Sequence, residues 1–447
     1  MYLVAGLGVT GQSVLNYFKT QDEVCLAFDT REDFDLTSLK KAYPEVEFAA
    51  GEIPNSWNNR FDTIVLSPGI SKQEPWVKAL RKLGKQVIGD IELFARAVGQ
   101  PVIAITGSNG KSTVTTITGM ALQEAGYLVG VGGNIGEPAL NLLVDDNEYD
   151  VYVLELSSFQ LETTYSLISV SSTILNISED HMDRYLGIED YIKAKTKVFA
   201  QTDLAVIPEG LSDNGLIVHE SLVHFSNAEG FIQSDDDYGV LIKEEQRWLG
   251  HGQVAQIKVS EMQLQGRHHE LNALAMLALC SPFNVDNQHF EKVLQHFTGL
   301  PHRTELVMVH NGVTWVNDSK GTNVGATITA IQSLGEQTEG KLVLIAGGVG
   351  KDADFSELIG PVGRYCKKVI LFGRDQAIMY QALAANDALE VERVPDLSMA
   401  VGLAMESAKD TDCILFSPAC ASFDQFQNYV QRGEVFSQLV EQACGLS

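Results

Sequence analysis

The sequence lacks an apolar run of the roughly twenty residues that a membrane-spanning helix needs, and it does not begin with a basic, signal-like segment. Its six cysteines include no C-x-x-C pair and no zinc-ligand spacing, so we expect reduced thiols. Positive charge is scarce: 32 Lys and Arg stand against 58 Asp and Glu, a formal net charge of −26, which disfavours a nucleic-acid binder. We therefore expect a cytoplasmic monomer with no membrane or nucleic-acid partner.

The chain has 447 residues, 45% of them hydrophobic and 20% charged, which is typical of a globular protein of about three domains. Apolar strand-like runs alternate with helical stretches, a pattern that favours mostly parallel α/β sheets. We expect three consecutive α/β domains: a Rossmann-like domain at 1–89, a P-loop-type central domain at 90–299 and a Rossmann-like C-terminal domain at 300–447. Short strand-like pieces between 204 and 257 predict a small antiparallel patch.

A glycine-rich turn at residues 106–113 follows the apolar run 101–105 and leads into a helical stretch. Backbone N–H groups at such a helix start bind phosphate oxygens, Lys111 can reach the β and γ phosphates, and Ser112 or a neighbouring hydroxyl can hold Mg²⁺. Ile105 stands where the usual pattern has glycine, so the loop is a shorter variant. The residues expected to bind ATP here are Gly107, Ser108, Asn109, Gly110, Lys111, Ser112 and Thr113.

Two further polar positions follow apolar strands of the central domain. Glu155 ends the run 151–154, where an acid next to the phosphate-loop strand could hold the magnesium; the alternative is a cap on the following helix. His181, within an acidic cluster, could bind a second cation or orient a substrate phosphate. Three lysines follow on a predicted helix, and spacing alone does not choose among Lys193, Lys195 and Lys197.

The first domain opens with Gly6-x-Gly8-x-x-Gly11 between a strand and a helix, and the next strand ends at Asp29. This is formally a dinucleotide fingerprint, which allows an NAD-dependent oxidoreductase. In the third domain, lysines lie in the loops 317–323 and 347–351, each at a predicted helix start. They predict a second anion site, such as one for a carboxylate, with the segment 417–424 facing the same cleft.

These features together indicate an enzyme that consumes ATP, with a nucleotide-like site in the first domain and a small anionic acceptor in the third. A compatible reaction transfers a phosphoryl group to a carboxylate, which an amine then attacks. A further alternative, from another functional class, is an ATP-driven switch that catalyses no ligation.

Four segments resemble the Mur ligases of bacterial cell-wall synthesis: LELSSFQL at 154–161, SEDHMDRY at 178–185, NDSKGTN at 317–323 and SPACASFDQF at 417–426. The resemblance covers essentially the whole chain. It implies that ATP, with two Mg²⁺ ions, drives addition of D-glutamate to UDP-N-acetylmuramoyl-L-alanine through an acyl phosphate. The D-N-P-R segment of a diaminopimelate-selecting relative is absent. Another Mur-type or folylpolyglutamate-type amide ligase is the alternative within this class.

The resemblance also implies roles for individual residues. UDP-substrate contacts are expected at Val9, Thr10, Thr30, Arg31, Gly69, Asn134 and His181. Besides the phosphate loop, ATP contacts are expected at Asn272, Arg303 and Asp318. The D-glutamate pocket is expected to comprise Lys320, Thr322, Lys351, Ser422 and Phe423. The metal ligands are expected to be Ser112, Glu155, His181 and a carbamylated Lys195, and the catalytic residues Lys111, Glu155, His181 and Lys195.

Three residues depart from the family pattern. His269 stands where relatives often have asparagine beside the adenine, Val349 where an acidic residue is common, and Tyr429 where phenylalanine is typical. The first departure affects an expected contact to the base, whereas we expect the other two to be tolerated.

Overall fold

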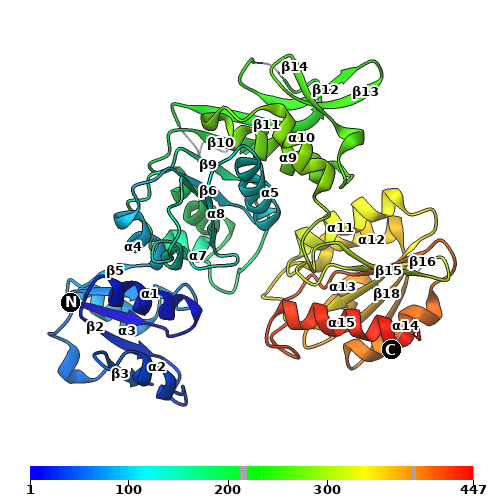
Figure 1. The fold of residues 1–447 in the computed structure, drawn as a ribbon. Coiled ribbons are helices and arrows are strands. Elements are labelled where there is room, and N and C mark those ends of the chain that lie inside the picture. The colour runs from blue at the N-terminus through cyan, green and yellow to red at the C-terminus, as the bar shows by residue number, and fades with distance from the viewer. Residues whose placement is uncertain (212–218, 233, 385–388, 446–447) are drawn as a thin grey trace. The chain divides into compact units, whose positions relative to one another are not determined.

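The computed structural model describes residues 1–211, 219–232, 234–384 and 389–445, and it contains three sheets with helices packed on them (Figure 1). The mixed α/β, mostly parallel architecture confirms the predicted fold class. The chain divides into two compact units. The first comprises Met1–Ile177, Glu189–Met262 and Glu270–His296, and the second comprises Ser178–Ile188, Gln263–His269 and the chain from Phe297 onward. The predicted domain boundaries near 89 and 299 stay predictions.

The N-terminal sheet is entirely parallel, with the strand order β3-β2-β1-β4-β5. Because β1 lies between β2 and β4, the strand order reverses there, and open α/β sheets bind ligands at such a point. The strands are β1 (Tyr2–Ala5), β2 (Cys25–Asp29), β3 (Glu47–Ala50), β4 (Thr63–Leu66) and β5 (Gln86–Ile88). The helices are α1 (Val9–Thr20), α2 (Thr37–Ala42), α3 (Pro75–Lys82) and α4 (Asp90–Ala97).

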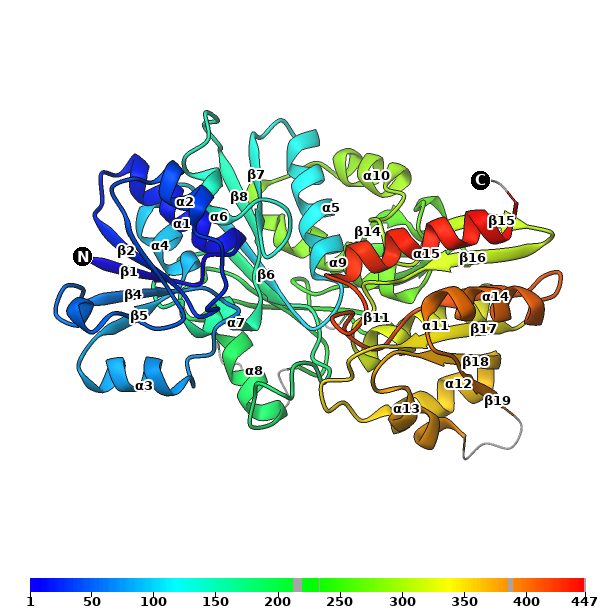
Figure 2. The same cartoon turned by 90° about the horizontal axis from the view of Figure 1, so that it is seen from below.

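The central sheet has nine strands, and β6 lies in it between β9 and β8. Every residue of β6 is buried, because helices such as α5 cover the sheet at this point (Figure 2). The strands are β6 (Val102–Thr106), β7 (Val129–Gly133), β8 (Val151–Glu155), β9 (Ser171–Ile174), β10 (Ala205–Pro208), β11 (Leu222–Glu229), β12 (Tyr238–Lys243), β13 (Gln246–His251) and β14 (Val254–Lys258). The helices are α5 (Lys111–Glu124), α6 (Ala139–Leu142), α7 (Ser158–Glu162), α8 (Ile188–Thr196), α9 (Arg267–Leu279) and α10 (Asn287–His296).

The antiparallel patch expected between 204 and 257 is only partly correct. Strands β10 and β11 run parallel to β9 and extend the main sheet, and only β12, β13 and β14 form an antiparallel meander. Parallel neighbours need a long crossover, and positions 209–221, some outside the described residues, separate β10 from β11. By contrast, Glu244 and Glu245 both have positive φ in the two-residue turn between β12 and β13, as a tight hairpin requires.

The C-terminal sheet has the order β15-β16-β20-β17-β18-β19, and only β15 is antiparallel to its neighbour. The last strand, β20, lies between β16 and β17, so the loops that follow these three strands meet at one edge. The strands are β15 (Glu305–His310), β16 (Val313–Asn317), β17 (Leu342–Gly347), β18 (Cys366–Phe372), β19 (Glu390–Arg393) and β20 (Cys413–Phe416). The helices are α11 (Val324–Gln337), α12 (Ile359–Tyr365), α13 (Gln376–Leu383), α14 (Leu397–Ser407) and α15 (Tyr429–Ala443).

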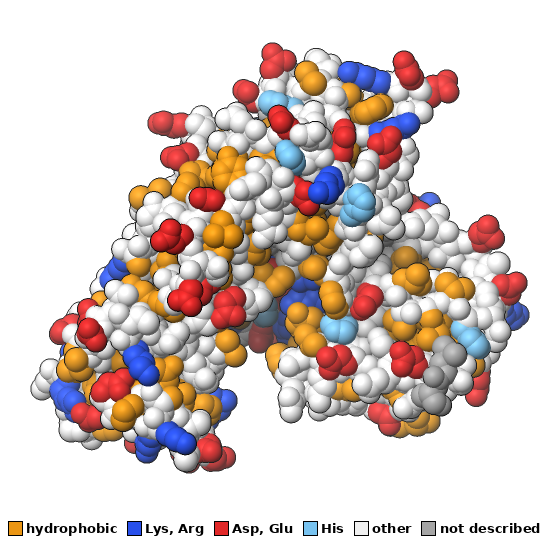
Figure 3. All heavy atoms as spheres, in the orientation of Figure 1, with side chains coloured by type: hydrophobic (Ala, Val, Ile, Leu, Met, Phe, Trp, Pro, Cys, Tyr) orange, Lys and Arg blue, Asp and Glu red, His pale blue; other side chains and the backbone are white. Residues whose placement is uncertain are grey.

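The surface and the cysteines agree with the composition. Acidic side chains are spread over the face drawn in Figure 3 and are not gathered into one patch. All six cysteines are free and buried. Within the described part of the chain, no helix combines the length and apolarity needed to cross a membrane.

The buried carboxylate of Glu92 joins α4 to the segment that follows α7. It accepts hydrogen bonds from the backbone N–H groups of Tyr165 (2.7 Å) and Ser166 (2.9 Å), and from Arg96 Nε (2.9 Å). Burial alone would raise the pKa of Glu92, but these bonds outweigh it and hold the pKa below its usual value. The carboxylate therefore stabilises the folded chain in its charged form.

We expect Glu92→Gln to lower the free energy of unfolding by about 1–3 kcal/mol at pH 7, since charge-assisted bonds to backbone N–H groups are lost. Because the pKa of Glu92 is depressed in the folded protein, this contribution is complete above the ordinary glutamate pKa of 4.5 and disappears as the pH falls through the folded pKa. Urea unfolding at pH 7 and at progressively lower pH measures it. The exposed Glu148→Gln is the control, and an equal loss in both variants would contradict the assignment.

Candidate active site

The phosphate loop connects β6 to α5 and depends on two glycines. Gly107 has φ +151° and Gly110 has φ +80°, conformations in which a side chain is strained. Ile105 is a fully buried residue of β6, paired with Glu155, so the turn begins only after it. This explains why glycine is not needed at position 105. The Nζ of Lys111 donates to the carbonyls of Gly107 and Ser108, both at 2.9 Å, so its ammonium lies over the loop.

Glu155 lies beside the phosphate loop because β8 pairs directly with β6. The predicted adjacency is therefore confirmed, and the cap of α7 is Ser157, not Glu155. The buried hydroxyl of Ser112 donates to Glu155 Oε2, and Asn134 Nδ2 donates to Oε1 at 2.7 Å. One carboxylate is thus shared between the start of α5 and the loop after β7.

The oxygens of Ser112 and Glu155 have the chemistry that Mg²⁺ prefers. Magnesium in nucleotide sites is usually held by one or two protein oxygens together with phosphates and water. The described residues contain no group of three or more His, Cys, Asp or Glu side chains that could hold a metal by themselves. The pair therefore fits an ion that arrives with a polyphosphate.

Of the three lysines between 193 and 197, the structure brings Lys195 to the phosphate loop. It is 2% exposed, and its Nζ lies 2.8 Å from the carbonyl oxygen of Gly107 and 4.7 Å from the centroid of the Tyr191 ring. Lys193 is exposed. Lys197 donates instead to the carbonyl of Glu162 at 2.7 Å, and burial lowers its pKa to about 8.

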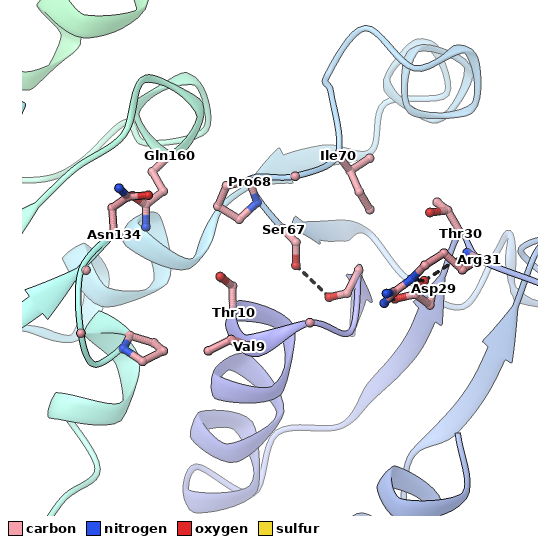
Figure 4. Close-up of a pocket in the computed structure, with 16 residues that line it drawn as sticks. Val9, Thr10, Asp29, Thr30, Arg31, Ser67, Pro68, Ile70, Asn134 and Gln160 are labelled. Atoms are coloured by element: carbon pink, nitrogen blue, oxygen red, sulfur yellow. Dashed lines mark hydrogen bonds and ion pairs between the residues drawn. The ribbon is translucent and has the colours of Figure 1, made fainter. Parts of the chain in front are cut away.

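A pocket of about 520 Å³ opens at the carboxyl ends of β1, β2 and β4 (Figure 4). The expected UDP-substrate residues of the N-terminal domain line it, and Asn134 and Gln160 face them from the central domain. Its lining residues are Gly6, Gly8, Val9, Thr10, Asp29, Thr30, Arg31, Ser67, Pro68, Gly69, Ile70, Gly133, Asn134, Gly136, Pro138 and Gln160. His181 is not among them and belongs to the second compact unit.

The acid expected to hold a dinucleotide ribose is engaged within the protein. Asp29 accepts the backbone N–H of Leu7 at 2.8 Å and two bonds from Arg31 at 2.8 and 2.9 Å. Burial alone would raise the pKa of Asp29, but the bonds from Arg31 and Leu7 hold it below its usual value. The guanidinium also stacks on Phe34, 4.2 Å from the ring centroid. The arrangement presents an oriented arginine to the pocket.

In the second compact unit, loops after β16, β17 and β20 carry the residues expected to bind D-glutamate. Lys320 Nζ lies 4.0 Å from the centroid of the Tyr429 ring, and Lys351 Nζ forms an ion pair with Asp180 at 2.7 Å. Ser422 is buried, whereas Phe423 is 73% exposed. Thr322 is half-buried in the loop after β16.

The expected ATP contacts are divided between the two units. Asn272 lies against the phosphate loop, since its Oδ1 would be 2.9 Å from a Cβ placed on Gly110. Arg303 and Asp318 lie in the second unit. Asp318 accepts bonds from Ser417 Oγ at 2.6 Å and from Thr304 N–H at 3.1 Å, and burial raises its pKa to about 6.

The structure shows the contacts of the three residues that depart from the family pattern. His269 packs against His268 at 3.9 Å between ring centroids, and burial together with that neighbour lowers the pKa of His269 to about 3. A neutral imidazole suits contact with an uncharged base. Val349 exchanges two backbone hydrogen bonds with Ala421, which its side chain does not affect. Tyr429 supplies the ring beneath Lys320.

Sequence reasoning missed two supporting residues, one in each compact unit. Arg432 is fully buried and donates to the carbonyls of Ser319 (2.7 Å) and Cys420 (3.0 Å), which joins the loops after β16 and β20. No local pattern reveals this contact, because its partners are distant in sequence. Gln160 completes a capping box with Ser157, and the S-x-x-Q spacing does predict that arrangement.

Three family models match the chain. The Mur ligase MurD-like N-terminal domain matches residues 1–89, the Mur ligase middle domain 105–280, and the Mur ligase glutamate ligase domain 302–420. A UDP-N-acetylmuramoylalanine–D-glutamate ligase of Hydrogenovibrio crunogenus is 58% identical over 99% of this chain and 98% of its own. One of Legionella pneumophila strain Paris is 40% identical over 98% of each.

Solved structures share the fold at low identity. The UDP-N-acetylmuramate-alanine ligase MurC of Thermotoga maritima has a TM-score of 0.61 and 16% identity, covering 99% of both chains. The MurF ligase of the same organism in complex with ADP has a TM-score of 0.63 and 16% identity, covering 99% of this chain and 94% of its own.

A matched pair of glycines tests the pocket. A Cβ on Gly11 would overlap the carbonyl oxygen of Gly6, whereas a Cβ on Gly8 meets nothing within 4 Å. We expect Gly11→Ala to lower the melting temperature, because the backbone must shift. Gly8→Ala should keep the melting temperature but weaken UDP binding, measured by calorimetry, since its methyl group enters the pocket. Unchanged UDP affinity in Gly8→Ala would contradict the expectation that UDP binds in this pocket.

Proposed function

The chain belongs to the Mur ligase family, and from that premise we propose that it catalyses the ATP-dependent addition of D-glutamate to UDP-N-acetylmuramoyl-L-alanine. The observation that carries an ATP-driven ligation is the grouping of Lys111, the Ser112–Glu155 pair and buried Lys195 around one phosphate loop. The named relatives, at 58% and 40% identity over nearly the full chain, support the choice of substrates.

The proposed reaction has two steps. A carboxylate oxygen of the L-alanyl group attacks the γ-phosphorus of ATP, and the bond to the β-phosphate oxygen breaks, which gives an acyl phosphate and ADP. The amine of D-glutamate then attacks the acyl carbon, loses a proton and displaces phosphate, which leaves the amide. Lys111 neutralises the charge on the transferred oxygens, the electrostatic contribution that dominates phosphoryl transfer.

The three ligands have separate proposed binding residues. The uridine diphosphate contacts Val9, Thr10, Thr30, Arg31 and Gly69, and Asn134 and His181 bind the rest of that substrate. ATP occupies the phosphate loop with Asn272, Arg303 and Asp318. D-glutamate is held by Lys320, Thr322, Lys351, Ser422 and Phe423. The uridine diphosphate assignment is supported by the pocket that these residues line together. The D-glutamate assignment is supported by the position of its residues in loops that follow neighbouring strands.

Magnesium is the proposed metal cofactor, with two ions. Ser112 and Glu155 would hold one, and His181 with carbamylated Lys195 the other. When bound, the ions neutralise charge on the phosphates. The burial of Lys195 beside Gly107 supports its role, because carbamylation would convert a buried cation at the loop into an anionic ligand.

We further propose that the protein acts as a monomer in the cytoplasm, without a membrane or nucleic-acid partner. Six free, buried thiols are typical of a reducing compartment. The formal net charge of −26 opposes binding to nucleic-acid phosphates.

A coupled phosphate-release assay tests the function. We expect sustained ADP formation only when UDP-N-acetylmuramoyl-L-alanine and D-glutamate are both present with ATP and Mg²⁺. Turnover with L-glutamate or diaminopimelate in place of D-glutamate would overturn the substrate assignment. A substrate-dependent change in NADH absorbance would instead indicate an oxidoreductase.

Substitution of two lysines on one helix tests the role of Lys195. Lys195→Ala should lower kcat on the order of a hundredfold, the usual loss when one electrostatic stabiliser is removed. Added short carboxylates such as formate should restore part of the activity by occupying the vacated anionic position. The exposed Lys193→Ala is the control and should match the parent. Full activity of Lys195→Ala would disprove the carbamate proposal.

A further inference from the structure

Strands β6 and β9 are neighbours in the central sheet (Figure 1). Asn176 follows β9, near the point where the phosphate loop leaves β6. Its side-chain amide makes two hydrogen bonds to one residue of the loop. Asn109 donates its backbone N–H to Asn176 Oδ1 at 2.8 Å, and Asn176 Nδ2 donates to the carbonyl oxygen of Asn109 at 3.0 Å. The side-chain amide of Asn176 therefore binds both the backbone N–H and the backbone carbonyl of Asn109.

The Asn176 side chain extends the hydrogen bonding between β6 and β9 beyond the last residues of these two strands. The backbone of Leu175 donates to Thr106 O at 2.9 Å, and Ser108 N–H donates to Asn176 O at 3.0 Å. One position later the backbones diverge, and the amide of Asn176 replaces a strand partner for Asn109. The rigid pairing of β6 with β9 is thus extended into the glycine-rich loop.

These contacts also determine which N–H groups face a bound phosphate. The N–H groups of Ser108 and Asn109 both point towards Asn176. The first-turn N–H groups of α5, which begins at Lys111, lack acceptors within the helix and carry its positive dipole end. Phosphate binding therefore falls to the start of the helix, and Asn176 fixes the loop in the shape that exposes it.

We infer that Asn176 is a positioning residue for ATP, which acts on the nucleotide only through the backbone of Asn109. This inference rests on the proposed function, since it assumes that the loop binds ATP. The bond from Ser108 N–H to Asn176 O involves backbone atoms only, so a substitution at 176 removes the two side-chain bonds and leaves the strand pairing intact.

The test compares Asn176→Ala and Asn176→Asp with the parent enzyme in the full ligase reaction. Asn176→Ala should raise the KM for ATP roughly 10- to 100-fold, the equivalent of two lost hydrogen bonds. The KM values for the UDP-linked substrate and D-glutamate should stay unchanged. Asn176→Asp keeps an acceptor for Asn109 N–H but cannot donate when ionised and adds negative charge, so its KM for ATP should be at least as high.

Hydrogen–deuterium exchange of the nucleotide-free protein provides a readout that does not depend on activity. The peptide covering residues 105–113 should exchange faster in Asn176→Ala, while peptides from β6 and β9 keep their protection. The control is Asn147→Ala, which removes an exposed amide bonded only to Asp145 and Tyr149 among the described residues.

The outcomes separate this inference from the proposed function. A parent enzyme that neither binds ATP nor releases ADP would refute the function itself. An active parent with an unchanged KM for ATP in Asn176→Ala would refute only the positioning role. Equal loss of activity toward all three substrates, with faster exchange across the whole central sheet, would show that Asn176 merely stabilises the fold.

Discussion

The parallel pairing of β6 with β8 on one side and β9 on the other is the constraint on which the candidate site depends. Carboxyl ends of parallel strands lie at one edge, so the pairing brings the phosphate loop, Glu155 and Asn176 together without any direct sequence signal between them. Each neighbour then acts on a different part of the loop. Glu155 accepts from Ser112 at the helix start, and Asn176 holds Asn109 in the turn.

The same principle operates in the N-terminal sheet, where the pocket opens at the reversal of strand order beside β1. Its far side is supplied by the central domain through Asn134 and Gln160, and both have a second task. Asn134 donates to Glu155, and Gln160 donates to the buried carboxylate of Asp90 at 3.1 Å. Because Asn134 contacts both the pocket and the acid beside the phosphate loop, the two sites share a structural element.

The sequence was sufficient for the fold class and for the strands that lead into the phosphate loop and Glu155, because buried strands are apolar runs whose ends are marked by polar residues or glycine. It could not select Lys195 from three lysines, since burial beside Gly107 depends on how α8 packs. The direction of β10 and β11 and the contacts of the buried Arg432 were missed for a related reason. Each is determined by contacts between residues far apart in the chain.

An acidic chain that binds anions must concentrate positive charge locally, and the way each cation is held affects how it can respond to a ligand. Lys111 donates to the backbone carbonyls of Gly107 and Ser108, so its ammonium group lies over the loop that is proposed to bind phosphate. Arg31 and Lys351 are instead paired with the carboxylates of Asp29 and Asp180. A ligand that pulled Arg31 or Lys351 away from its acid would leave a mostly buried carboxylate without a cation, which is costly. Arg31 and Lys351 therefore favour ligands that share the cation with its acid.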